Sequence, residues 1–168
     1  MPRHFSAILS AYSYVDKSTA SRIAESMASA ISVWRALNEV CSQRGNTFDA
    51  EMKLLIVDDH AGVRKLIREL MGHRTTEIRE CSDGEEAIRI CAEFAPDFVI
   101  MDLQMPGMDG FEATRRLVAE YPRLRVIAVS HLKHPEAEER ARQAGAFHFV
   151  RKENLFDLAR YLGRISNP

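Results

Sequence analysis

The stretch Phe98-Val99-Ile100-Met101-Asp102 decides the fold of this chain. It is a short apolar run that stops at a carboxylate, as a fully buried strand does when it reaches the edge of a sheet. Three other short apolar runs also stop at polar side chains, namely the pair Asp58-Asp59, then Ser130 and Lys152. If the runs are parallel strands, these ends share one edge of the sheet, where open α/β folds bind their ligands. Three carboxylates, a hydroxyl and an ammonium are then expected in one crevice, a set suited to a divalent cation and a phosphoryl group.

From Met52 onward, strand-like runs alternate with helical patterns, which predicts an α/β fold with a doubly wound parallel sheet. The sequences Ser82-Asp83-Gly84-Glu85 and Asp109-Gly110-Phe111-Glu112 have the pattern of capping boxes that open helices. The expected strands are 52–57, 75–81, 97–102, 125–130 and 147–151, and the expected helices are 61–71, 86–94, 110–121, 135–145 and a last one from 154.

The polarity of the five strands predicts their order. The first, third and fourth are almost uniformly apolar and therefore central, whereas the second and fifth carry charge or histidine and belong at the edges. The order 2-1-3-4-5 of flavodoxin-like sheets satisfies this pattern. It brings Asp58, Asp59 and Asp102 together at the point where the strand order reverses.

A serine-rich segment, residues 1–51, precedes the domain predicted for residues 52–168. Apolar residues at alternating steps of four and three predict one amphipathic helix at about 18–44. This helix could pack on its own downstream domain or, less favourably, pair with a second copy. A third interpretation takes Met52 as the natural start and the upstream residues as an extension.

The composition excludes several classes of function. The 168 residues carry a net charge of -1, so no basic patch indicates nucleic-acid or membrane-surface binding. No apolar run approaches the length of a membrane span. The three cysteines lack metal-site or disulfide-framework spacing, which favours a reducing, cytoplasmic environment.

The predicted carboxylate cluster requires neutralisation. At about 4 Å, each pair of carboxylates costs about 1 kcal/mol in water and about 4 kcal/mol at the edge of a protein. Either one carboxyl stays protonated or a cation binds, and oxygen ligands at an open rim favour Mg²⁺. Taken singly, each of these residues could be a helix cap, a turn residue or a solvated charge. Together, four strand ends with matching chemistry make those separate explanations less favourable.

Residues 52–168 resemble the receiver domain of two-component response regulators, of the stand-alone, chemotaxis-regulator-like kind. The motifs that carry the resemblance are Val57-Asp58-Asp59-His60, Asp102-Leu103-Gln104-Met105-Pro106-Gly107, Ala128-Val129-Ser130 and Phe147-His148-Phe149-Val150-Arg151-Lys152. The resemblance implies a signalling protein and not an enzyme.

The resemblance also implies a role for each site residue. Asp102 would accept a phosphoryl group from a histidine kinase or phosphotransfer protein, and Lys152 and Ser130 would contact its oxygens. Asp59, Asp102 and the backbone carbonyl of Gln104 would hold Mg²⁺, with Asp58 acting through water. Phe149 would be the aromatic switch that turns inward behind Ser130. The added charge would then shift an inactive/active equilibrium read by an unknown downstream protein on the fourth-helix to fifth-helix face.

The chain departs from the family pattern at several positions. Glu153 follows Lys152 where many receivers have proline, so a cis peptide is not expected there. Ser130 replaces the commoner threonine, and His131 is bulkier than the usual residue and could limit access. Gln104 could influence attack by water, and Phe149 lacks the hydroxyl of a tyrosine.

Other functions remain as alternatives. A pseudo-receiver that only binds a partner would usually lack part of the acid set, whereas Asp58, Asp59 and Asp102 are all present here. A hydrolase that forms an aspartyl-phosphate needs a second aspartate at the position of Gln104. A nucleotide binder needs a phosphate-cradling loop after the first strand, where this chain has Asp58-Asp59. Direct DNA binding is not expected, and a homodimer remains open.

Overall fold

In the computed structural model, the described residues are 52–71, 77–131, 135–155, 157–158 and 161–162, and they belong to one compact unit, Ala50–Pro168. The helix predicted at about 18–44 and the domain boundary predicted at residue 51 lie outside them.

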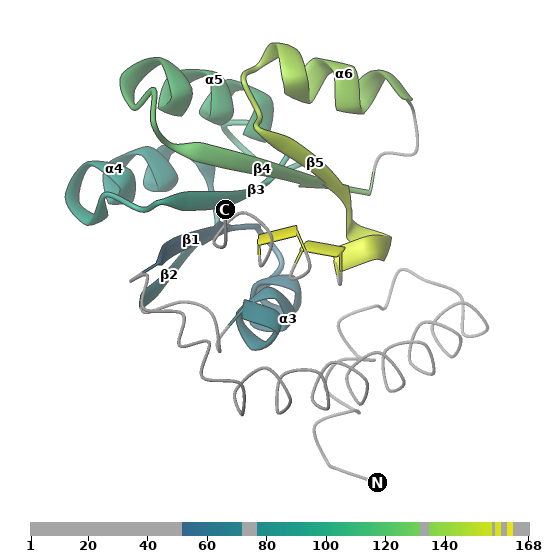
Figure 1. The fold of residues 1–168 in the computed structure, drawn as a ribbon, viewed down its shortest axis with the longest axis horizontal. Helices are drawn as coiled ribbons and strands as arrows, with labels where there is room; N and C mark the ends of the chain where they lie inside the picture. Colours follow the sequence, from purple (N-terminus) through teal and green to yellow (C-terminus); the bar gives the residue numbers. More distant parts are fainter. Residues whose placement is uncertain (1–51, 72–76, 132–134, 156, 159–160, 163–168) are drawn as a thin grey trace, which may run out of the picture. The chain divides into compact units, whose positions relative to one another are not determined.

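Strands and helices alternate along the described part of the chain (Figure 1). The strands are β1 (Lys53–Val57), β2 (Glu77–Cys81), β3 (Phe98–Asp102), β4 (Arg125–Ser130) and β5 (His148–Arg151). The helices are α3 (Ala61–Met71), α4 (Gly84–Phe94), α5 (Gly110–Glu120), α6 (Pro135–Gln143) and the short 3-10 turn η1 (Lys152–Asn154). Among the described residues, no helix is both long and apolar enough to cross a membrane.

The five strands form one parallel sheet in the order β2-β1-β3-β4-β5, which confirms the predicted topology. The central strands are buried along almost their whole length, whereas β2 alternates between exposed and partly buried residues. In the register, Val57 pairs with Met101, and Asp102 pairs with Val129. The carboxyl ends of β1, β3 and β4 therefore lie at one edge, on the right in Figure 1.

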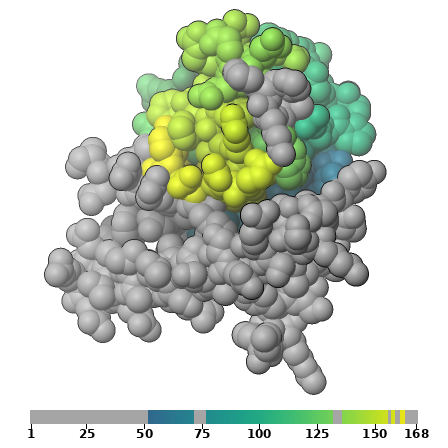
Figure 2. All heavy atoms as spheres, turned by 90° about the vertical axis from the view of Figure 1, so that its right-hand side faces the viewer, coloured from purple at the N-terminus to yellow at the C-terminus, as the bar shows by residue number. Residues whose placement is uncertain are grey.

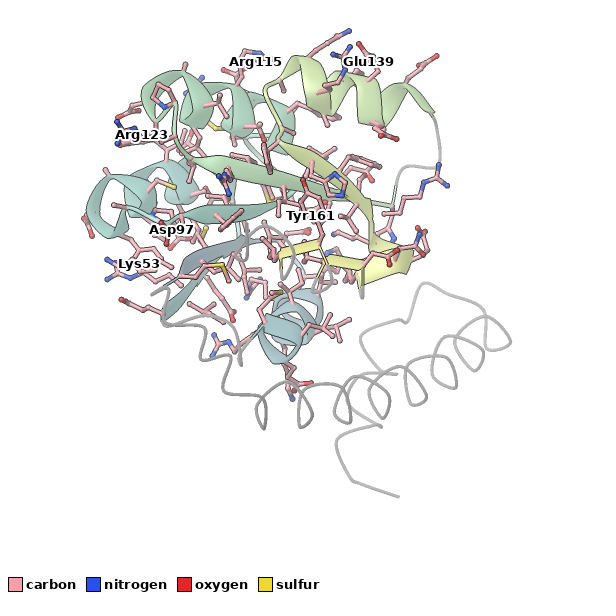
Figure 3. All side chains as sticks on the ribbon, in the orientation of Figure 1. Lys53, Asp97, Arg115, Arg123, Glu139 and Tyr161 are labelled. Atoms are coloured by element: carbon pink, nitrogen blue, oxygen red, sulfur yellow. The ribbon has the colours of Figure 1, made fainter. Side chains whose placement is uncertain are left out.

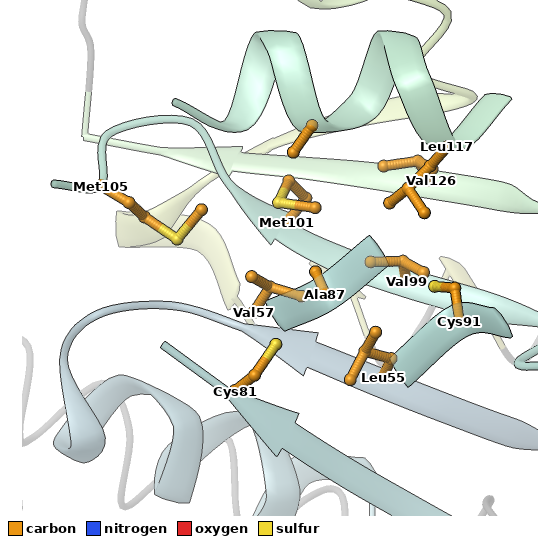
Figure 4. Packing of buried hydrophobic residues seen from close by; sticks show 11 residues of the cluster. Leu55, Val57, Cys81, Ala87, Cys91, Val99, Met101, Met105, Leu117 and Val126 are labelled. Atoms are coloured by element: carbon orange, nitrogen blue, oxygen red, sulfur yellow. The ribbon is translucent and has the colours of Figure 1, made fainter. Parts of the chain in front are cut away.

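Two apolar clusters lie on the sheet face that α4, α5 and α6 cover. The first, which we call the α4–α5 core, joins β1, β2, β3 and β4 to α4 and α5 (Figure 4). Its buried members are Leu55, Val57, Cys81, Ala87, Cys91, Val99, Met101, Met105, Ala113, Leu117 and Val126. The second, the α6 core, consists of Leu103, Phe111, Ala128, Ala141 and Ala144, with Ala146 and Phe149 partly buried against it.

The opposite face of the sheet is covered by α3 and by the segment that follows β5 (Figure 1). Helix α3 buries Val63, Leu66, Ile67, Leu70 and Met71, at the spacing of an amphipathic helix. The described residues after η1 are helical, and Leu155, Leu158 and Leu162 are buried among them. A helix after residue 154 was predicted, although the chain first makes the 3-10 turn at Lys152–Asn154.

The start of α4 differs from the prediction. Helix α4 begins at Gly84, two residues before the predicted start, and its N-cap is Asp83, not Ser82. The Asp83 carboxylate accepts a hydrogen bond of 2.9 Å from the Glu86 N–H, so the carboxylate cap prevails over the hydroxyl one residue earlier. The second predicted cap is confirmed, because Asp109 Oδ1 accepts from the Glu112 N–H at 2.8 Å.

Helix α6 ends at Gln143, close to the predicted stop at Gly145. Gly145 has φ +96°, a left-handed conformation in which the chain leaves the helix without a Cβ clash. The Ala146 N–H bonds to the Ala141 carbonyl and the Gly145 N–H to the Arg142 carbonyl, which together form a Schellman motif. This turn directs the chain into β5.

Candidate functional site

Asp58 follows β1 and is held on several sides. Its residue is 0% exposed, and its Oδ1 accepts a hydrogen bond of 2.9 Å from the His60 N–H. The Arg64 guanidinium donates to the Asp58 carbonyl oxygen at 2.7 Å, and the Asp58 N–H bonds to the Cys81 carbonyl of β2. The turn from β1 into α3 is therefore fixed by both backbone and side-chain hydrogen bonds.

Asp102 is the last residue of β3 and is 2% exposed. Its Oδ1 accepts a hydrogen bond of 3.1 Å from the Gln104 N–H, which orients the carboxylate at the strand end. The loop behind it is packed closely, because a Cβ added to Gly110 would lie 1.9 Å from the Asp102 carbonyl oxygen. Glycine at the start of α5 therefore permits the close approach of this helix to the site.

Lys152 joins the two buried acids. Its Nζ lies 2.7 Å from Asp102 Oδ2, with hydrogen-bond geometry, and 2.7 Å from Asp58 Oδ2, as an ion pair. The lysine side chain is only 3% exposed. Despite the short ion pair, Asp58 Oδ2 accepts no hydrogen bond of good geometry from the described residues. This buried oxygen has capacity for a further partner.

The charges at this edge do not balance. Three carboxylates, Asp58, Asp59 and Asp102, face one ammonium, that of Lys152, which leaves a formal charge of about -2 when all are ionised. Burial and the nearby Asp58 raise the pKa of Asp102, and Lys152 only partly offsets them. Burial acts to lower the pKa of Lys152, but Asp58 and Asp102 outweigh it and raise that pKa above its usual value. The lysine therefore stays charged, and the site retains an excess of negative charge that favours a cation.

Asp59 and His60 form the outer rim of the site. The Asp59 side chain is 26% exposed and that of His60 is 66% exposed. His60 Nδ1 lies 2.7 Å from Asp59 Oδ1 and 3.8 Å from Asp58 Oδ1. Asp58, Asp59 and His60 can each offer one ligand atom, and these atoms lie within 4.8 Å of one another. This donor set fits a metal ion at the rim.

Ser130 ends β4, next to β3. The Leu103 N–H bonds to the Val129 carbonyl at 3.1 Å, which ties the residue after Asp102 to the residue before Ser130. Ser130 is fully buried. Phe149 pairs with Ala128 in the register of β4 and β5 and lies partly buried against the α6 core.

The structure thus brings the predicted residues to one edge. Lys152 contacts both Asp58 and Asp102. Asp59 follows Asp58 at the end of β1, and Ser130 ends β4, the neighbour of β3. Gln104 is at the site through its N–H, and the use of its carbonyl as a ligand stays a prediction. The peptide after Lys152 is trans, as expected. His131 is half-exposed, and its Nδ1 lies 3.8 Å from the Glu153 carboxylate.

Three features of the site were not predicted from the sequence. One is the ion pair of Lys152 with Asp58, and another is the contact of His60 with the acid pair. The third is Arg64, which bonds to the Asp58 carbonyl and to Glu80 of β2 at 3.3 Å. The adjacency of His60 to two aspartates was the only signal available for it, and Arg64 looks like any other helical arginine in the sequence.

Comparisons with known proteins agree with this geometry. The family model described as "Response regulator receiver domain" matches residues 54–162. The response regulator GacA of Pseudomonas aeruginosa is 33% identical over 105 residues, which cover 60% of this chain and 48% of that protein. The transcriptional activator protein ExaE of Pseudomonas putida is 38% identical over 103 residues, with the same two coverages. The crystal structure of a LuxR-family two-component response regulator from Aurantimonas sp. has a TM-score of 0.64 at 31% identity, covering 70% of this chain and 86% of that one. The chain therefore spans about half the length of the curated relatives it matches.

Proposed function

The chain belongs to the response regulator receiver family, and from that premise we propose that Asp102 accepts a phosphoryl group from a histidine kinase or phosphotransfer protein. The protein then acts as a phosphorelay signalling component in the cytoplasm, not as an enzyme with its own small-molecule substrate. GacA and ExaE carry about as much chain again outside the matched region. The output of this protein, including the absence of direct DNA binding, is therefore part of the proposal.

The observation that carries the proposal is the position of Lys152 Nζ, 2.7 Å from the Oδ2 atoms of both Asp58 and Asp102. A buried ammonium at this point keeps the acceptor carboxylate oriented and can follow the negative charge onto a phosphoryl oxygen. Phosphoryl transfer depends mainly on positioning and on neutralisation of charge. The ammonium, the acceptor and the acid pair supply both.

Asp59 and Asp102, with the Gln104 carbonyl, are the proposed ligands of Mg²⁺, and Asp58 would contribute mainly through water. Oxygen-only ligands at a partly open rim suit this ion, which keeps several of its waters. The fit is supported by the excess negative charge of the site and by the remaining acceptor capacity of the buried Asp58 Oδ2 beside Lys152. When bound, the ion would neutralise the acids and stabilise negative charge on the phosphoryl group.

In the proposed transfer, an Asp102 carboxylate oxygen attacks the phosphorus of a phosphohistidine. The new O–P bond forms as the N–P bond breaks, and the electron pair of that bond returns to the imidazole nitrogen of the donor. Lys152 moves its hydrogen bond from the carboxylate to a phosphoryl oxygen, and Ser130 donates to another. Phe149 turns inward toward the α6 core. This changes the face that runs from α6, the fourth helix of the domain, to the helical residues after η1, the fifth, and an unknown downstream protein reads that face. Figure 2 shows the side on which α6, in yellow-green, and the segment from β5 onward, in yellow, lie next to each other.

The test is covalent labelling of the full chain by acetyl phosphate with Mg²⁺, followed by intact mass. The wild-type protein should gain one hydroxylamine-labile phosphate, and Asp102→Asn should gain none. Asp97→Asn is the matched control, since Asp97 lies just before the other end of β3 and its side chain accepts from the Lys53 N–H at 2.8 Å (Figure 3). An Asp102→Asn protein that still gained the labile phosphate would contradict the proposal.

Two alternatives predict other results in the same experiment. A pseudo-receiver that only binds a partner would gain no phosphate even as wild type. A hydrolase that forms an aspartyl-phosphate would turn over a phosphate ester, but the position of its general acid is occupied by Gln104. A homodimer remains a prediction, and sedimentation with and without beryllofluoride tests it.

A further inference from the structure

We propose that His60 is a nitrogen ligand at the rim of the metal site, so that the site binds Zn²⁺ or Co²⁺ with a preference that the three carboxylates alone would not give. This inference rests on the proposed metal site and concerns which ions it selects. The residues that carry it are Asp58, Asp59 and His60.

The backbone of His60 is fixed before any ion binds. Its N–H donates to Asp58 Oδ1 at 2.9 Å, and its carbonyl accepts from the N–H groups of Val63 and Arg64 at 3.0 and 3.2 Å. His60 is thus locked between the buried acid and the first turn of α3. Only its two side-chain torsions remain free, so little conformational entropy is lost when the ring binds an ion.

The ring already lies at the acid pair. His60 Nδ1 is 2.7 Å from Asp59 Oδ1, and the ring is largely exposed to solvent, so an ion can approach it. The buried Asp58 carboxylate lies beside the ring, because its Oδ1 is 3.8 Å from His60 Nδ1. Its Oδ2 pairs with Lys152 at 2.7 Å but accepts no hydrogen bond of good geometry from the described residues, so this carboxylate has capacity for a further partner. An ion bound here would replace the contact between His60 Nδ1 and the Asp59 carboxylate.

The donor chemistry decides the selectivity. Carboxylates alone suit Mg²⁺, whereas imidazole suits first-row transition ions, whose affinity for mixed nitrogen and oxygen sites rises toward the end of the row. A nitrogen ligand should therefore strengthen the binding of Zn²⁺ and Co²⁺ and leave that of Mg²⁺ nearly unchanged. If the His60–Asp59 contact is only a hydrogen bond that orients Asp59, removing it should weaken all three ions alike.

The experiment compares the dissociation constants of Mg²⁺, Co²⁺ and Zn²⁺ for the full chain by calorimetry. His60→Ala should weaken Co²⁺ and Zn²⁺ by about tenfold or more and change Mg²⁺ by less than about twofold. His60→Gln restores a hydrogen-bond donor to Asp59 but not the imidazole, so it should fail to restore Co²⁺ and Zn²⁺ binding. His131→Ala is the matched control, because His131 is also a half-exposed histidine next to a strand end.

A direct readout comes from the histidine ring nitrogens in NMR spectra of the full chain. Zn²⁺ should shift the Nδ1 signal of His60, and Mg²⁺ should not. The inference is overturned if His60→Ala weakens the binding of all three ions equally, or if His60→Gln restores the binding of Co²⁺ and Zn²⁺. Either result leaves the proposed phosphorylation of Asp102 standing. A wild-type protein that binds no Mg²⁺ and takes up no phosphate would instead show that the proposed function itself has failed.

Discussion

The two apolar clusters on the same face of the sheet differ in the size of the side chains that hold their helices. In the α4–α5 core, helix α5 contributes Leu117 to a layer built on valine, leucine and methionine from the strands. In the α6 core, helix α6 contributes Ala141, and the residue that follows the helix end contributes Ala144. Burying a leucine side chain contributes about 1.5–3 kcal/mol, whereas one methyl group contributes about 0.8 kcal/mol. Helix α6 is therefore held to the sheet by much less apolar burial than α5.

This difference coincides with the proposed switch. The α6 core contains Ala128, which precedes Ser130 by two residues, and it is where Phe149 is partly buried. Small side chains leave α6 free to shift at low cost when Phe149 turns inward. The α4–α5 core is packed more closely, since a Cβ on Gly84 would lie 2.9 Å from the Cβ of Ala113 and 3.0 Å from Met108 Cγ. In the proposed switch, we therefore expect the α4–α5 core to stay in place and the α6 core to change shape.

The largest effect is expected for Leu117→Ala. Leu117 is 0% exposed in the α4–α5 core, so its truncation should lower the free energy of unfolding by about 2–5 kcal/mol. Ala141→Gly in α6 should cost only about 1–2 kcal/mol, from helix propensity and one lost methyl group. Urea denaturation of both variants gives the two values. Similar losses would contradict the difference between the two cores.

A second test uses native-state hydrogen exchange. The amides of α6 should exchange through a local opening, with a free energy about 2 kcal/mol or more below that of α5, because fewer apolar contacts break. Beryllofluoride with Mg²⁺ should change the protection of α6 and β5 and leave that of α5 nearly unchanged. If α5 and α6 open together with the same free energy, α6 is no weaker than the rest and the switch needs another physical basis.

The sequence was sufficient to predict the sheet, for physical reasons that are visible in the strands. Apolar runs buried on both faces identify β1, β3 and β4, and charged runs identify the edge strand β2. The side chains just past the apolar runs could therefore be assigned to one edge. The start of α4 could not be predicted to the residue, because Ser82 and Asp83 are both good caps and the cap preferences of serine and aspartate are nearly equal.

The contacts within the site were only partly predictable. That Asp58, Asp102 and Lys152 share an edge follows from strand order alone. That one lysine lies 2.7 Å from both acids depends on side-chain conformations, which long-range packing sets and no local pattern encodes. The same holds for Arg64, whose two partners come from β1 and β2.

Enlarging one alanine in each core should give a smaller difference in the free energy of unfolding. Ala113→Val and Ala141→Val place the same side chain within a helix, so their loss of helix propensity, about 0.6 kcal/mol, is common to both. Ala113 lies against Gly84, so overpacking should lower the free energy of unfolding of its variant by a further 1–3 kcal/mol, roughly. Ala141 shares its cluster with Ala128 and Ala144 as well as Leu103 and Phe111, and we expect the free energy of unfolding of its variant to fall by less than about 1 kcal/mol beyond the propensity loss. Equal losses by urea denaturation would show that the α6 core has no spare room.

The smallest effect concerns the far side of β5. Successive side chains of a strand point to opposite faces, so His148 lies on the face away from the α6 core, where its ring stacks on that of Tyr161 with 3.7 Å between the ring centroids. Burial lowers the pKa of His148, and Glu138 offsets this only in part. As the pH falls below about 6.5, the unfolded chain takes up a proton that the folded protein resists, so stability should fall, and only slightly because solvent screens the partly exposed ring.

His148→Phe keeps a ring for Tyr161 and removes the titrating group, so it should flatten the dependence of stability on pH between about pH 5 and 7. Urea midpoints at a series of pH values compare this variant with the wild type. Because His148 and Phe149 are neighbours on one strand, the His148→Phe protein should also keep the exchange rates of α6. Faster exchange there would mean that the two faces of β5 are coupled and that the weakness of the α6 core extends through the sheet.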